Sequence, residues 1–139
     1  TTGRSFAKGV TSQVASTYVT TVNATDINST WGVITASVTT GKSFAKGSTD
    51  LASGTYTTTS FNDSSWGILS EQTTTGVSFQ KGDTDLIASS YTTIATGIET
   101  NWGTITETTT DGESYAQGDT TKISGTYQTI SSNDDSWGI

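Results

Sequence analysis

Aromatic side chains recur along this chain at nearly constant intervals. One pattern of rings occurs four times, and the first ring of each copy is a phenylalanine or tyrosine. A tyrosine follows the first ring by twelve residues, and each tryptophan precedes the first ring of the next copy by thirteen residues. Only the tyrosine-to-tryptophan segment varies, from ten to thirteen residues. Constant spacing is typical of strands paired in register, and variable spacing is typical of loops. The pattern predicts a tandem repeat, whose rings are Phe6, Tyr18, Trp31, Phe44, Tyr56, Trp66, Phe79, Tyr91, Trp102, Tyr115, Tyr127 and Trp137.

The repeat divides the chain into four copies. They cover residues 1–38, 39–73, 74–108 and 109–139, and the fourth lacks the strand that follows the tryptophan in the others. The first copy likewise lacks, before it, the tryptophan-led strand that precedes each of the other copies. We therefore expect the sequence to be part of a longer array of copies, in which an upstream copy or a neighbouring molecule supplies the strand missing at the start. Complete copies of 35 to 38 residues are too small to bury a face alone, so we expect them to stack.

The composition favours β-structure throughout. Thr supplies 33 residues and Ser 20, which together make up 38% of the chain. Threonine is β-branched and suits a pleated sheet, whereas serine and glycine suit turns. Each copy is interpreted as about three short strands, which lie around the first ring, through the tyrosine and from the tryptophan onward. The predicted fold is all-β, with the copies stacked as a β-solenoid-like or β-sandwich rod.

The twelve rings are expected to form the structural core of that rod. An aromatic side chain can bury about 150–250 Å², and the chain has few leucines and isoleucines to replace it. The Asp, Asn and Ser residues before each tryptophan predict a turn. The glycine after it predicts a left-handed backbone or room for a ring of the adjacent copy. We therefore expect the indole rings to lie between successive copies.

The composition excludes most catalytic chemistry. The chain has no His and no Cys, and therefore no imidazole base, no Ser-His-Asp triad, no disulfide and no usual zinc site. Asp83 and Asp85 are the carboxylate pair that glycoside hydrolysis could use, but the other copies do not repeat them. We predict a protein that is not an enzyme and that has no catalytic residues, metal ligands or cofactor. Calcium bound by the carboxylates of residues 133–136 is an alternative, although EF-hand spacing is missing.

The charge distribution limits the partners. The net charge is −7, and residues 74–139 carry nine acids against Lys81 and Lys122, whereas residues 1–73 are balanced. An acidic chain without a basic stripe does not suit nucleic acid. No apolar run approaches the ~20 residues of a membrane span. Self-association with copies of the same chain or with neighbouring repeats is therefore the expected partnership.

The segments between tyrosine and tryptophan are the predicted functional surface. Acids and amides beside a ring are typical of lectins, because they can bond sugar hydroxyls while the ring stacks on the sugar. The same residues also form ordinary turns. The candidate glycan-binding residues are Asn28, Asn62, Asp63, Asn101, Asn133 and Asp134.

Short sequence segments around the tryptophans resemble those of a known group of proteins. The segments STWGVITAS, DSSWGILSE and ETNWGTITE resemble the repeated phrases of repetitive virion structural proteins from large tailed phages of marine cyanobacteria. Extracellular bacterial filament proteins and adhesins look similar. The resemblance implies a fibre or decoration role, without a cofactor, in the extracellular space or at a virion surface. The alternative is a multivalent carbohydrate-binding protein, either a compact repeat fold or a four-bladed propeller.

Overall fold

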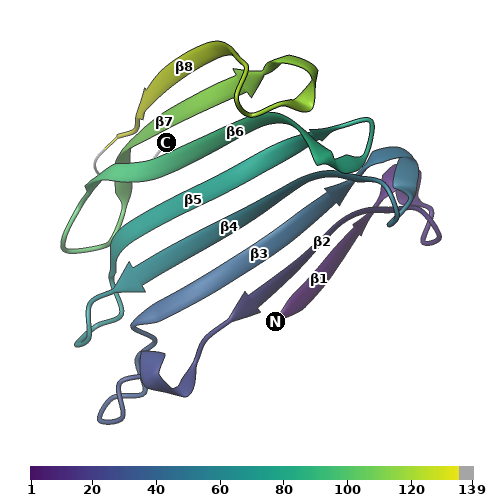
Figure 1. Ribbon diagram of the computed structural model, residues 1–139. Coiled ribbons are helices and arrows are strands. Elements are labelled where there is room, and N and C mark those ends of the chain that lie inside the picture. Colours follow the sequence, from purple (N-terminus) through teal and green to yellow (C-terminus); the bar gives the residue numbers. More distant parts are fainter. Residues whose placement is uncertain (135–139) are drawn as a thin grey trace.

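Eight strands follow one another across a single antiparallel sheet, in the order in which they occur in the chain (Figure 1). The computed structural model describes residues 1–134. The strands are β1 Thr2–Phe6, β2 Val14–Thr21, β3 Ala36–Phe44, β4 Ala52–Asn62, β5 Leu69–Gln80, β6 Asp83–Ile98, β7 Ile105–Tyr115 and β8 Ile123–Ser132. The all-β prediction is confirmed.

Two sets of loops alternate between the two ends of the strands. The lysine loops, residues 7–13, 45–51, 81–82 and 116–122, join β1 to β2, β3 to β4, β5 to β6 and β7 to β8. Three of them contain a short 3-10 turn, at Ala7–Gly9 (η1), Ala45–Gly47 (η3) and Ala116–Gly118 (η4). The tryptophan loops, residues 22–35, 63–68 and 99–104, join the strands at the opposite end, and the first contains η2, Ala24–Asp26.

Each copy contributes two strands to the sheet and not three. The segment after each tryptophan runs on into the first-ring segment of the next copy, so that β3 spans the boundary at residue 38 and β5 the boundary at residue 73. Gly41 and Gly76 lie inside these segments without forming a turn, because each is paired within the sheet, and the residues alternate between the two faces as in any strand. Residues 1–134 form one sheet without a second layer, so the solenoid-like or sandwich rod is not confirmed.

A row of alternating glycines and tyrosines crosses the whole sheet. The pairing runs Gly3, Tyr18, Gly41, Tyr56, Gly76, Tyr91, Gly112 and Tyr127 from β1 to β8. Each tyrosine ring covers the glycine of the preceding strand, since a Cβ built on Gly41 would lie 2.2 Å from Cε1 of Tyr56. Aromatic cover of a strand glycine is a known way of stabilising a sheet. These four tyrosine rings therefore pack on bare glycine backbone within their own sheet.

Hydroxyl groups bond to one another across the same face. Where an even-numbered strand meets the next odd one, threonine hydroxyls pair, with Oγ1 atoms 2.9 Å apart in Thr20–Thr39 and 2.8 Å apart in Thr58–Thr74 and Thr93–Thr110. Within the hairpins, serine hydroxyls pair at 2.7 Å in Ser5–Ser16 and Ser78–Ser89. Cross-strand hydroxyl pairs contribute roughly 0.2–1 kcal/mol each.

The sheet has almost no buried interior. Ala52 is the one buried hydrophobic residue described, and the accessible surface is 8780 Å². A folded monomer of this mass has about 6,900 Å² on average. Both faces of the sheet are therefore largely accessible to solvent.

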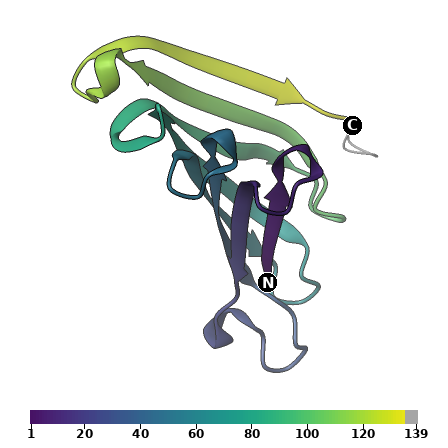
Figure 2. The ribbon, with the colours of Figure 1, turned by 90° about the vertical axis from the view of Figure 1, so that its right-hand side faces the viewer.

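The sheet is also strongly twisted, so that β8 and β1 run in very different directions (Figure 2).

The prediction of an aromatic core is wrong for the described rings, because none of them is buried. Phe44, Phe79, Tyr91 and Tyr115 are half-buried. Phe6, Tyr18, Tyr56 and Tyr127 are 37–48% exposed, and the three described tryptophans are much more so. A single layer has no opposing surface against which a ring can be enclosed. Trp137 lies outside the described residues.

Candidate functional site

Each tryptophan loop is held by one polar side chain placed three residues before the indole. In the second loop, Oδ1 of Asp63 accepts the backbone N–H groups of Ser65 at 2.7 Å and Trp66 at 2.8 Å. Asp63 N–H also donates to Ile68 O at 2.8 Å, and Gly67 N–H donates to Asp63 O at 3.1 Å. Gly67 completes the turn with a φ of 71°, a region that favours glycine.

The other two loops repeat this arrangement with different chemical groups. Asn28 Oδ1 accepts from Thr30 at 2.9 Å and from Trp31 at 3.3 Å. Glu99 Oε2 accepts from Asn101 at 2.9 Å and from Trp102 at 2.8 Å. An amide, an aspartate and a glutamate therefore perform the same local task. The Asp, Asn and Ser residues before each tryptophan predict this turn, and in the third loop the residue that holds it is Glu99.

The turn directs the indole rings outward. Trp31, Trp66 and Trp102 are 72%, 81% and 84% exposed. Each ring lies in the loop and not at the start of a strand, because the strand begins several residues later, at Ala36, Leu69 or Ile105. This corrects the expectation that the indoles lie between successive copies. Gly32, Gly67 and Gly103, which follow these three tryptophans, have φ values of 69–71°, so the predicted left-handed backbone is confirmed for them.

Successive tryptophan loops lie side by side. They are two strands apart, which corresponds to roughly 10 Å. Asn28 Nδ2 donates to Ser64 O of the next loop at 2.9 Å. A Cβ on Gly67 would lie 2.9 Å from Cγ1 of Val33 in the preceding loop, and one on Gly103 would lie 2.8 Å from Leu69 N. The three rings therefore form a regular series along one end of the sheet.

The six candidate glycan-binding residues do not converge on a common pocket. Asn28, Asp63 and Asn101 are engaged within the tryptophan loops, where Asn101 Nδ2 donates to Glu99 Oε1 at 2.6 Å. Asn62 Nδ2 donates to Ile34 O at 3.0 Å, and Asn133 Nδ2 donates to Ile105 O at 3.1 Å. Asp134 follows β8 and is also engaged. Most of these polar groups shape or join the loops, and the indole rings are the groups that remain accessible.

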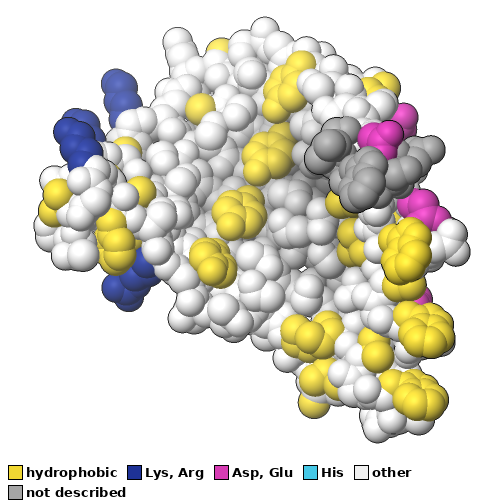
Figure 3. Space-filling model, turned by 180° about the vertical axis from the view of Figure 1, so that it is seen from behind, with side chains coloured by type: hydrophobic (Ala, Val, Ile, Leu, Met, Phe, Trp, Pro, Cys, Tyr) yellow, Lys and Arg dark blue, Asp and Glu magenta, His cyan; other side chains and the backbone are white. Residues whose placement is uncertain are grey.

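Charge is divided between the two ends of the strands. In residues 1–134 the tryptophan-loop end carries no Lys or Arg, and its acids are Asp26, Asp63, Glu71, Glu99, Glu107 and Asp134. All six cations lie in the half nearer the lysine loops, where acids are also present. Figure 3 shows the basic side chains at one end and the acidic ones beside hydrophobic groups at the other. The tryptophan series therefore lies in an acidic setting that disfavours anionic ligands.

The pKa values of two loop carboxylates respond to these contacts. The Trp66 backbone N–H is the main cause that lowers the pKa of Asp63, and the Asn101 backbone N–H lowers that of Glu99. A group whose pKa is lowered by folding stabilises the fold fully above its unfolded pKa of about 4, and this contribution is lost as the pH falls through the folded pKa. In the first loop the amide of Asn28 takes the place of this carboxylate.

We therefore expect two of the three tryptophan loops to respond to acid. The backbone amide NMR signals of Trp66 and Trp102 should shift as the pH falls through the acid range, each with a midpoint below that of an unfolded Asp or Glu, while that of Trp31 stays constant. Asp63→Asn should remove the response of Trp66 and keep the turn, because asparagine already holds the first loop. A common titration in all three loops, or midpoints above those of the unfolded carboxylates, would contradict this assignment.

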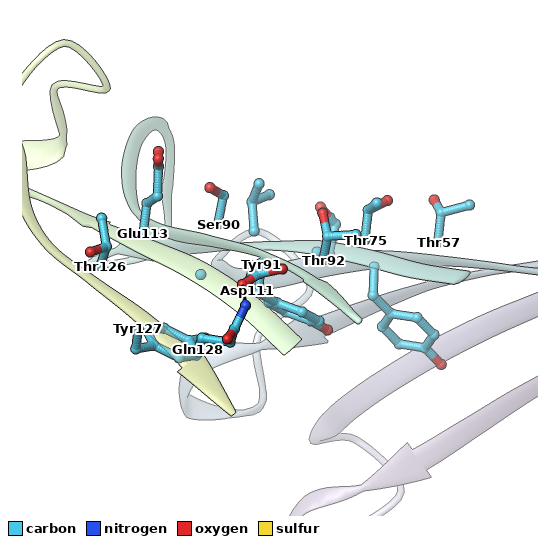
Figure 4. Close-up of a pocket in the computed structure, with 15 residues that line it drawn as sticks. Thr57, Thr75, Ser90, Tyr91, Thr92, Asp111, Glu113, Thr126, Tyr127 and Gln128 are labelled. Carbon is cyan, nitrogen blue, oxygen red and sulfur yellow. Dashed lines mark hydrogen bonds between the residues drawn. The ribbon is translucent and has the colours of Figure 1, made fainter. Parts of the chain in front are cut away.

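Two hollows follow the glycine–tyrosine row. The larger, of about 770 Å³, is lined by residues 55–57, 75–77, 90–92, 111–113 and 126–128. Figure 4 shows Tyr91 and Tyr127 on one side of the sheet, with Thr57, Thr75 and Thr92 on the other. Gln128 Nε2 donates to Asp111 Oδ1 at 2.7 Å beside them.

The residues singled out for catalysis or calcium do not form a described site. Asp85 N–H donates to Asp83 Oδ1 at 3.0 Å, so that pair belongs to the turn at the start of β6. Residues 1–134 contain no group of three or more His, Cys, Asp or Glu residues arranged to hold a metal ion. The calcium alternative at residues 133–136 lies partly outside the described residues.

No helix among the described residues is long and apolar enough to cross a membrane.

The function of this chain has to be argued from the sheet and its loops. Comparisons with family models, with curated proteins and with solved structures found no match.

Proposed function

We propose that the chain is a non-catalytic structural module that assembles by continuing its β-sheet, as in an extracellular or virion fibre or filament. The observation that carries this proposal is the open, single-layer sheet. Each copy adds two strands in the same register, and nothing in the described residues terminates the series. A sheet of this kind can be lengthened at either edge without any change to its interior.

The exposure of the sheet supports assembly on physical grounds. An edge strand presents unpaired N–H and C=O groups that can pair with another chain. Every residue of β8 is exposed, and β1 has four exposed residues of five. The accessible surface exceeds that of an average monomer of this mass, so association removes surface that folding alone leaves in water.

Assembly can be tested on the purified chain. Sedimentation at increasing concentration should show growth beyond the monomer, and electron micrographs should show elongated particles. Fibre diffraction should give a strand spacing of about 4.8 Å. A chain that stays monomeric at the highest soluble concentration, with the β-sheet spectrum of a folded protein, would overturn the proposal.

The exposed tryptophans favour a second candidate function, carbohydrate binding. Three exposed indoles, carried by loops whose strands are roughly 10 Å apart, offer flat apolar surfaces along one end of the sheet. An extended, neutral, β-linked polysaccharide could stack successive sugar rings on them, whereas the surrounding acids disfavour an anionic glycan. Because the loop amides and carboxylates are engaged in the turns, recognition would depend on stacking more than on side-chain hydrogen bonds.

Carbohydrate binding can be tested separately from assembly. Titration with a soluble neutral β-linked polysaccharide should quench or shift tryptophan fluorescence saturably. Trp66→Ala, at the centre of the series, should weaken binding and leave the melting temperature nearly unchanged, because its side chain is 81% exposed. Tyr56→Ala, on the sheet face, is the matched control that should leave binding intact. No response of the wild-type fluorescence to neutral polysaccharides would exclude this function.

A further inference from the structure

The two edge strands of this sheet are complementary to each other. We propose that β8 of one molecule pairs antiparallel with β1 of a second copy, with Tyr127 opposite Gly3. The inference rests on the proposed structural function and specifies its contact. The register follows from the three places where an even-numbered strand already meets the next odd-numbered one, between β2 and β3, β4 and β5, and β6 and β7.

The glycine–tyrosine row fixes that register. At all three internal junctions a tyrosine of the even strand pairs with a glycine of the odd strand, as in Tyr56↔Gly76. The row ends with Tyr127 on β8 and begins with Gly3 on β1. Placing these two residues opposite each other continues the alternation without interruption, and it also sets four flanking pairs, Thr1↔Thr129, Thr2↔Gln128, Arg4↔Thr126 and Ser5↔Gly125.

Three of the flanking pairs have direct precedents at the internal junctions. Thr1 with Thr129 repeats the hydroxyl-bonded pairs such as Thr20–Thr39. Arg4 opposite Thr126 matches Lys42↔Thr17, and Ser5 opposite Gly125 matches Ser78↔Gly54. A Cβ on Gly125 meets nothing within 4 Å, whereas one on Gly54 would lie 2.9 Å from Val77 O. Gly125 has the space that the neighbouring strand fills at the internal junction.

The charges of the two edges also match. Arg4 would join the cross-strand row that contains Glu113, two strands away at roughly 10 Å. The β8 side belongs to the acidic half of the chain and the β1 side to the half with Arg4, Lys8, Lys42 and Lys46. Pairing β8 with β8 would instead bring the acidic halves together. A join between two different edges is heterologous, so it extends to a filament unless it closes on itself.

The chain contains no cysteine, so paired single-cysteine variants can map the join. Mixtures of Arg4→Cys with Thr126→Cys, and of Thr2→Cys with Gln128→Cys, should form disulfide-linked heterodimers in a glutathione buffer. Directly opposed residues lie within about 4.5–5.5 Å between Cα atoms, which a disulfide can span. The off-register control, Arg4→Cys with Gln128→Cys, should give roughly tenfold less, because diagonal neighbours lie about 7–8 Å apart. Two in-register mixtures keep the test valid if one substitution disturbs the edge.

The outcomes separate the join from the proposed function. In-register cross-links well above the control support the join. Equal cross-linking in all mixtures, or a preferred Thr126→Cys homodimer, overturns the β8–β1 contact but leaves assembly through another surface possible. Oligomers in sedimentation without cross-links in any mixture have the same meaning. A monomeric wild-type chain without cross-links in any mixture overturns both.

Discussion

Gly76→Ala is expected to destabilise the sheet by about 1–3 kcal/mol, the usual cost of adding a methyl group to an occupied space. A Cβ at Gly76 would lie 2.5 Å from Cε1 of Tyr91, so the ring must leave the glycine that it covers. Gly125→Ala is the matched control, because a Cβ there meets nothing within 4 Å. Alanine is better than glycine within a strand by roughly 0.5–1 kcal/mol, so this variant should be neutral or slightly more stable.

A double-mutant cycle identifies the cause of that loss. In a Tyr91→Ala background the space above Gly76 is empty, so Gly76→Ala should no longer destabilise the protein. Urea unfolding followed by circular dichroism gives the four free energies of unfolding. If the cost of Gly76→Ala is the same with and without the tyrosine, the ring is not what excludes the methyl group.

Gly82→Ala is expected to cost about 2–4 kcal/mol, from backbone strain and from a steric clash. Gly82 has a φ of 80°, and a Cβ there would lie 2.9 Å from Cβ of Leu51 in the preceding lysine loop. Gly9 has a similar backbone, with a φ of 69°, but nothing lies within 4 Å of its Cβ position. Gly9→Ala should therefore cost only the strain of a left-handed residue, about 1–2 kcal/mol.

The difference between these two variants measures the packing between neighbouring lysine loops. A contact between neighbouring lysine loops also occurs at Gly47 against Gln13, and Gly118 makes a similar contact with Leu86 at the start of β6. The measurement is again the free energy of unfolding from urea titration. Equal losses for Gly9→Ala and Gly82→Ala would show that the loops do not support one another.

The sequence was sufficient to predict the β-structure and the places of the tryptophan loops. Fixed and variable spacings between rings depend on pairing and on loop length, which are local properties of a repeat. It was not sufficient for the strand count, because the TTG segments at residues 39–41 and 74–76 begin a copy in the sequence pattern without beginning a strand. They lie within β3 and β5. The constant interval of fifteen residues from Gly41 to Tyr56, and from Gly76 to Tyr91, was the available signal for a cross-strand pair.

Ring burial could not be predicted from the spacing. A large aromatic residue favours burial, but burial also requires an opposing layer, and this depends on how the strands are arranged in space. The tryptophans follow Asn28, Asp63 and Glu99, whose side chains hold a tight turn and direct each indole outward. The candidate glycan-binding residues are engaged within the loops for a similar reason, because side chains that can bond a sugar hydroxyl can equally bond nearby backbone groups.

The meander order of the strands determines how the chain responds to mechanical force. The first and last strands described, β1 and β8, lie at opposite edges of the sheet (Figure 1). Tension applied between them pulls each outer strand away from its neighbour and opens the hydrogen bonds one after another, as in a zipper. Each 35-residue copy would release roughly 120 Å of contour length. The sheet should therefore extend in low, evenly spaced steps, which single-molecule stretching can record, and recoil when the load is removed.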